Sequence, residues 1–122
     1  MGKWLQYLPG NITRGEMMIY NKLVRDKIPE MIRQQGQEPV VRILEEEEYV
    51  RCLHQKLDEE VAEFHRDLNG EELADILEVV LALAANLGIS QEKLAEIYRE
   101  KHTQRGGFAD RVFLVFKTDN CL

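Results

Sequence analysis

Apolar residues recur every three or four positions in the middle of the chain. From position 50 onward they are Val50, Leu53, Leu57, Val61, Phe64 and Leu68. This spacing places them on one face of an α-helix, so the pattern predicts an amphipathic helix that begins near Glu45. Asn69 and Gly70 follow it, and this dipeptide is typical of a turn. The chain is therefore expected to reverse direction directly after its first long helix.

Two more helices are predicted after this turn. The second covers residues 71–87 and ends before Gly88. Its apolar residues lie on nearly every side, which indicates a central and buried helix. Ser90 is a favourable N-cap for a third helix over residues 91–105, and Gly106 with Gly107 is expected to end it.

Shorter elements are predicted on either side of the three helices. Pro29 suits the first turn of a short helix that stops at Gly36. Residues 40–44 and 111–116 are rich in β-branched and aromatic side chains, so each predicts a short strand, and the two strands are expected to pair. The predicted fold class is mainly α, an antiparallel helical hairpin or bundle with a small two-stranded β element.

Length and composition favour one globular domain. The chain has 122 residues, of which 44% are hydrophobic and 31% charged, and this excludes a disordered chain. Residues 19–116 are expected to form the domain, with residues 1–18 as an N-terminal extension or leader and residues 117–122 as a C-terminal tail. The longest nearly apolar stretch, residues 76–85, is too short to span a bilayer.

The net charge and the spacing of the cysteines and histidines limit what the chain is expected to bind. The net charge of −6 argues against a nucleic-acid polymer, because a phosphate backbone is bound by an extended basic surface. Cys52 and Cys121 have no metal-ligand spacing, so both are expected to be reduced thiols in a cytoplasmic protein. The three histidines have no ligand spacing among themselves and are expected to be surface or packing residues. They are His54, His65 and His102.

Four carboxylates flank the predicted turn. Glu60 and Glu63 are three positions apart on the first long helix, and Glu72 and Asp75 repeat that spacing on the second. In an antiparallel hairpin the turn brings Glu63 level with Glu72 and Glu60 level with Asp75. Two like charges about 4 Å apart repel by about 4 kcal/mol at an effective dielectric constant of about 20. A divalent cation relieves this repulsion, and a set of oxygen ligands suits Mg²⁺, with Mn²⁺ as a substitute.

A purely structural interpretation of these residues stays open. Charged runs on helices are usually solvated, and Asn69-x-x-Glu72 also fits a helix-capping box. Glu78 continues the spacing after Asp75 and is either a further ligand or the partner of a basic residue. Two of the four carboxylates also fit weak surface ion pairs. These candidate pairs are Lys56 with Glu60 and Glu63 with Arg66.

Basic residues are available on either side of the acidic hairpin. The apolar stripe of the third helix continues into Lys101 and Arg105, and charges that prolong an inward-facing stripe favour an anion or an acidic partner. The alternative is hydrogen bonding to the last carbonyl groups of that helix. Lys22, Arg25 and Lys27 lie near the other end of the chain. Because arginine and lysine clamp phosphate oxygens, these five residues form the expected phosphate-binding set.

The combined motifs resemble those of a known family. Glu59-Glu60-x-x-Glu63 followed by Glu72-x-x-Asp75 resembles the metal signature of the MazG-like all-α nucleoside triphosphate pyrophosphohydrolases. Two flanking runs resemble its phosphoribosyl-ATP pyrophosphohydrolase-like branch. They are YNKLVRDKIP at residues 20–29 and EKHTQRGGF at residues 100–108. The likeness covers residues 19–116.

The resemblance implies a reaction and a ligand set. The reaction is hydrolysis between the α and β phosphates, which gives a nucleoside monophosphate and pyrophosphate, in a homo-oligomer (dimer or tetramer). The implied Mg²⁺ ligands are Glu60, Glu63, Glu72 and Asp75. On this hypothesis Glu63 also accepts the proton of the attacking water. Two alternatives are a phosphoribosyl-ATP pyrophosphohydrolase and a non-catalytic, metal-binding helical assembly module.

Overall fold

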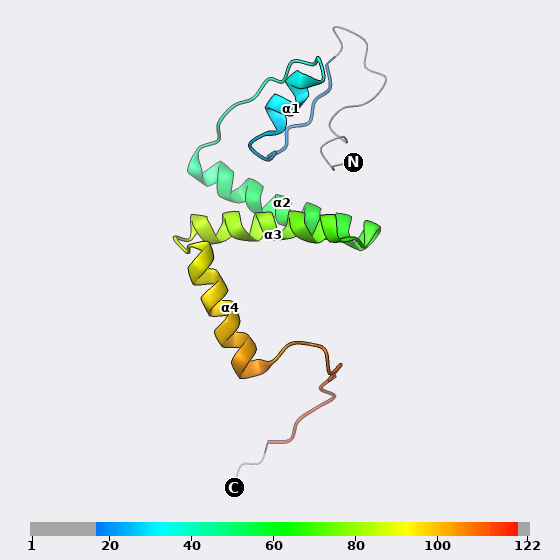
Figure 1. The fold of residues 1–122 in the computed structure, drawn as a ribbon, viewed down its shortest axis with the longest axis vertical. Helices are drawn as coiled ribbons and strands as arrows, with labels where there is room; N and C mark the ends of the chain where they lie inside the picture. The colour runs from blue at the N-terminus through cyan, green and yellow to red at the C-terminus, as the bar shows by residue number, and fades with distance from the viewer. Residues whose placement is uncertain (1–16, 120–122) are drawn as a thin grey trace. The chain divides into compact units, whose positions relative to one another are not determined.

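Helices make up the regular structure of this protein. The computed structural model describes residues 17–119, which contain α1 (Ile28–Gln34), α2 (Glu46–Asp67), α3 (Gly70–Asn86) and α4 (Gln91–Arg105) (Figure 1). The chain divides into two compact units, the first ending at Leu83 and the second beginning at Ala84. The mainly α fold class is thus confirmed, and the bounds of the long helices agree with the predicted ones to within a few residues. Residues 1–16 of the expected extension and 120–122 of the expected tail, including Cys121, lie outside the described residues.

The first unit begins with an extended segment and the short helix α1. Pro29 occupies the first turn of α1, where its missing N–H is not needed, and Ile28 is buried beneath it. Gly36 has φ of 83°, a left-handed conformation that glycine adopts readily, and the helix ends just before it. The predicted short helix is therefore confirmed at both ends.

A tight turn joins α2 to α3. Leu68 takes the left-handed conformation, with φ of 49°, and its N–H donates to the carbonyl of Phe64 at 2.8 Å. Asn69 then caps α3, because its Oδ1 accepts a hydrogen bond from the N–H of Glu72 at 2.9 Å. The chain reverses within these two positions, as the Asn69-Gly70 signal predicted.

The buried side of α2 changes character along its length. Leu53 is buried, and three charged residues on the same helical face are buried after it. They are Lys56, Glu60 and Glu63. On α3, Glu72 and Val79 are buried. The apolar part of the hairpin thus lies away from the turn, and the buried charge lies toward it.

Helix α3 is less buried than its apolar sequence predicted. Leu73 and Leu77 are 51% and 55% exposed. A helix that is apolar on every side needs cover on every side, and the described residues of this chain cover only one. The prediction of a central and buried helix is therefore wrong for the described residues of the single chain.

The two predicted strands do not form. Residues 17–119 contain no strand, and residues 40–44 and 111–116 are neither helical nor extended in a ladder (Figure 1). A strand is stable only with a hydrogen-bonded partner, and β-branched composition does not supply one. Arg111 has φ of 60° and its N–H donates to Phe108, so it lies in a turn. Arg42 makes a bidentate ion pair with Glu48, at 2.8 and 2.7 Å, and this holds its segment to the start of α2.

Helix α4 belongs to the second unit. Ser90 caps it, since its Oγ accepts from the N–H of Lys93 at 3.1 Å, and Gly106, with φ of 75°, ends it. Both ends agree with the prediction. None of the residues of α4 is buried. Among the described helices, no single one has the length and apolar character to cross a membrane.

Candidate metal centre

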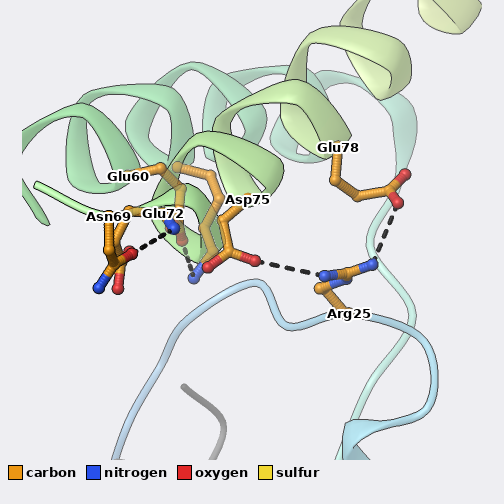
Figure 2. A network of polar contacts seen from close by, with 7 residues as sticks. Arg25, Glu60, Asn69, Glu72, Asp75 and Glu78 are labelled. Atoms are coloured by element: carbon orange, nitrogen blue, oxygen red, sulfur yellow. Dashed lines mark hydrogen bonds and ion pairs between the residues drawn. The ribbon is translucent and has the colours of Figure 1, made fainter. Parts of the chain in front are cut away.

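Three carboxylates converge beside the turn of the α2–α3 hairpin. Glu60 on α2 and Glu72 and Asp75 on α3 each offer one oxygen atom, and these oxygens lie within 4.8 Å of one another. Glu60 is 3% exposed and Glu72 is 5% exposed, while Asp75 is partly buried. Figure 2 shows the three side chains turned toward the same point. Of the four predicted ligands, the structure brings these three together.

The local structure explains why these residues meet. Asn69 sets the first turn of α3 through its hydrogen bond to the Glu72 N–H, and this fixes where the Glu72 side chain leaves the helix (Figure 2). Asp75 follows one turn later on the same face. Glu60 is two turns before the end of α2, which is the height that the predicted antiparallel register gives it. The hairpin therefore places the cluster by register alone.

The fourth predicted ligand, Glu63, lies one turn from Glu60 and is also buried. Its oxygens are not among the atoms that converge within 4.8 Å. The Oε2 atoms of Glu60, Glu63 and Glu72 are buried and accept no hydrogen bond from residues 17–119, although each side chain has other interactions. The role of Glu63 as a ligand and proton acceptor stays a prediction.

A buried lysine offsets part of this negative charge. Lys56 lies one turn before Glu60 on α2, and its Nζ is 3.6 Å from Glu60 Oε1 and 3.5 Å from Glu59 Oε1. Lys22 reaches Glu59 from the N-terminal segment, at 3.2 Å. The sequence suggested a weak surface pair for Lys56 and Glu60, but both residues are buried, so solvent screens their attraction less. Lys56 thus partly neutralises the α2 side of the cluster.

Arg25 spans two carboxylates of α3. Its Nη1 is 3.3 Å from Asp75 Oδ1, and its Nη2 is 3.1 Å from Glu78 Oε1 (Figure 2). Glu78 is therefore the partner of a basic residue, which was one of its two predicted roles. These contacts join positions 50 and 53 apart in the chain, and no local pattern in the sequence indicates such pairs.

The predicted phosphate-binding residues lie in three places. Lys22 and Arg25 lie at the acidic cluster, where they contact carboxylates. Lys27 is exposed at the start of α1. Lys101 and Arg105 are exposed on α4, in the second unit, and their part in the same site stays a prediction.

The remaining candidates behave as surface residues. All three histidines are exposed, as expected, and none belongs to the group of converging ligands in the described residues. Cys52 is a partly buried free thiol on α2, and its reduced state stays a prediction because Cys121 lies outside the described residues.

Comparison with known proteins adds one relative. A protein of Mycolicibacterium smegmatis, described as uncharacterized, is 60% identical to this chain over 42 residues. The match covers 34% of this chain and 43% of that protein, so less than half of the relative's length is spanned. No family model matches the chain, and no solved structure matches it. The functional argument therefore starts from the geometry of the acidic cluster.

Proposed function

We propose that this protein is a Mg²⁺-dependent nucleoside triphosphate pyrophosphohydrolase, a hydrolase that cleaves the α–β phosphoanhydride of its substrate. The observation that carries the proposal is the convergence of Glu60, Glu72 and Asp75 oxygens within 4.8 Å at a largely buried point. Hydrolysis adds water across the anhydride and yields a nucleoside monophosphate and pyrophosphate. The resemblance of the acidic motif and its flanks to the MazG-like family supports this choice of reaction.

The donor set fits a hard divalent cation. All three converging atoms are carboxylate oxygens, which is the ligand type that Mg²⁺ and Mn²⁺ prefer. Three negative charges at this separation repel one another strongly where water is excluded, and a doubly charged ion balances them. Glu60, Glu72 and Asp75 would hold the ion, with Glu63 as the fourth ligand in the family pattern. When bound, Mg²⁺ supplies charge neutralisation of the phosphates and acidifies water.

The chain's own residues have separate roles in this proposal. Glu63, buried one turn from Glu60, takes the proton of the attacking water on its carboxylate. Lys22 and Arg25 already contact carboxylates of the α2–α3 hairpin and would neutralise the departing pyrophosphate. Lys27, Lys101 and Arg105 are alternatives for that role. The exposed leucines on α3 favour a homo-oligomer, in which a second copy covers them.

A panel of triphosphates with Mg²⁺, read out by pyrophosphate release, tests the proposal. Glu72→Gln and Glu63→Gln are expected to lower turnover by at least about a hundredfold, because each removes a charge that the reaction requires. Glu71→Gln is the matched control, since Glu71 precedes Glu72 on the same helix and is exposed. Undiminished release in Glu63→Gln would remove Glu63 from the mechanism. Release of pyrophosphate from none of the substrates would refute the reaction.

The same panel separates the two alternatives. Including phosphoribosyl-ATP distinguishes a phosphoribosyl-ATP pyrophosphohydrolase from an enzyme that acts on common triphosphates. The assembly module is favoured by the exposed apolar side of α3, and it predicts that Mg²⁺ raises the melting temperature with no turnover of any nucleotide.

A further inference from the structure

The N-terminal segment contacts the acidic cluster through ion pairs. Lys22 reaches Glu59 on α2, and Arg25 reaches Asp75 and Glu78 on α3. Only Asp75 belongs to the three converging ligands. Arg25 therefore places a positive charge directly on one candidate metal ligand, from a segment that precedes both helices (Figure 2).

The ion pairs of Arg25 contribute little to the stability of the fold. The Arg25 side chain is 59% exposed, and an exposed ion pair contributes little to folding. Met17, Met18 and Ile19 are exposed, Leu23 and Val24 are partly buried, and the first buried apolar residue after them is Ile28. A cavity of about 60 Å³ lies between residues 21–23 and the neighbouring face of α2, beside the Lys22–Glu59 ion pair. The Arg25 side chain is itself exposed, so its position depends mainly on the carboxylates it contacts.

We infer that Arg25 is a displaceable counter-cation, which competes with the metal ion for Asp75 and moves fully onto Glu78 when the ion binds. The inference rests on the proposed function. Asp75 and Glu78 are three positions apart on one face of α3, so the guanidinium can leave the first and keep the second by a small rotation. Glu78 is then a positioning residue that acts through Arg25, and Asp75 is shared between two cations that exclude each other.

Removing the Arg25 charge is expected to tighten metal binding. A unit charge about 5 Å from a divalent ion, even when screened as in water, changes the affinity by on the order of tenfold. Arg25→Gln is therefore expected to bind Mn²⁺ about tenfold more tightly than the wild-type protein in calorimetric titration. Arg33→Gln is the matched control, because Arg33 belongs to the same unit and pairs only with Glu30 and Glu38 in the described chain. The control is expected to change the affinity by less than about twofold, since a distant exposed charge is screened.

An unchanged or weaker Mn²⁺ affinity in Arg25→Gln overturns the inference and leaves the metal site of the proposed function standing. Absence of Mn²⁺ binding in the wild-type protein and in both variants refutes the proposed site itself. A second measurement uses the wild-type protein, so its result does not depend on the folding of a variant. The NMR signal of the Arg25 Nε–H is expected to shift on saturation with Mg²⁺, and an unmoved signal at saturation contradicts the exchange.

A double-mutant cycle tests the part that Glu78 plays. Glu78→Gln alone is expected to weaken Mn²⁺ binding severalfold, because Arg25 then has only Asp75 to contact. In the Arg25→Gln background the same change is expected to alter the affinity by less than about twofold. An equal loss in both backgrounds would make Glu78 a direct ligand and overturn the exchange.

Discussion

Glu72→Gln is predicted to stabilise the protein without metal and to reduce strongly the stabilisation that metal provides. Glu72 is 5% exposed, and its carboxylate converges with those of Glu60 and Asp75. Glutamine has nearly the same size and keeps the burial, so the substitution changes mainly the charge. The metal-free protein should then be relieved of part of its internal repulsion.

The magnitude follows from the geometry. At 4.8 Å, the upper limit of the separations, two unit charges repel by about 3.5 kcal/mol at an effective dielectric constant of about 20. Glu72 takes part in two such pairs, but Lys56 near Glu60 and the other interactions of Glu72 offset much of this. The loss of a negative charge in the first turn of α3 opposes this gain and lowers the free energy of unfolding by about 0.3–1 kcal/mol. A net increase of about 1–2 kcal/mol in the free energy of unfolding is therefore expected.

Urea unfolding at pH 7.5 in EDTA, and again in Mg²⁺, measures both effects. Mg²⁺ at a hundred times its dissociation constant should raise the wild-type unfolding free energy by about 2.7 kcal/mol, and that of Glu72→Gln much less. Glu71→Gln should show no gain in EDTA, only the loss of about 0.3–1 kcal/mol for a first-turn charge, and its gain in Mg²⁺ should equal that of wild type, because Glu71 is exposed and lies outside the converging carboxylates. If Glu72→Gln were less stable than wild type in EDTA, the carboxylates would not be held together against their repulsion, and the electrostatic reasoning would be refuted.

Three further outcomes follow from particular contacts. Asn69→Ala removes the cap that Asn69 Oδ1 provides to the Glu72 N–H, so urea unfolding should show a loss of about 1 kcal/mol, and Asn69→Asp should restore most of it. The hydrogen bond from Arg42 lowers the pKa of Glu48, so NMR titration of Arg42→Gln should show this pKa rising toward its ordinary value. A lowered pKa stabilises the folded state above the unfolded-state pKa, and this stabilisation is lost as the pH falls through the folded-state pKa. The wild-type protein should therefore lose more stability than Arg42→Gln on acidification, and an equal loss would contradict this account. Leu53→Ala should cost about 2–4 kcal/mol, since Leu53 is the most buried apolar residue of α2, and a cost below about 1 kcal/mol would mean that the hairpin has no core there.

The helices were predictable because their determinants are local. Apolar spacing set the buried face of α2, and short signals such as Ser90 and Gly106 set the ends of α4. The two strand predictions were wrong because a strand requires a hydrogen-bonded partner elsewhere in the chain. The composition of residues 111–116 expresses only a preference, and the left-handed conformation of Arg111 sets a turn where the strand was expected to begin.

The candidate site was predictable to the extent that register determines it. Once the chain turns at Asn69, the heights of Glu60 and Asp75 follow from helix geometry, and both reach the cluster. The contacts of Arg25 with α3 depend on the path of the N-terminal segment, and neither spacing nor composition contains that information. Lys56 was visible as a neighbour of Glu60, but its burial depends on how α2 packs.

The location of a bound ion tests the central claim most directly. Crystals grown with Mn²⁺ and measured at a wavelength where manganese scatters anomalously would show where the ion lies. The account predicts an anomalous peak about 2.1 Å from oxygens of Glu60, Glu72 and Asp75, at the point where these side chains converge. A peak elsewhere on the protein, or no peak between these three carboxylates at saturating Mn²⁺, would contradict it.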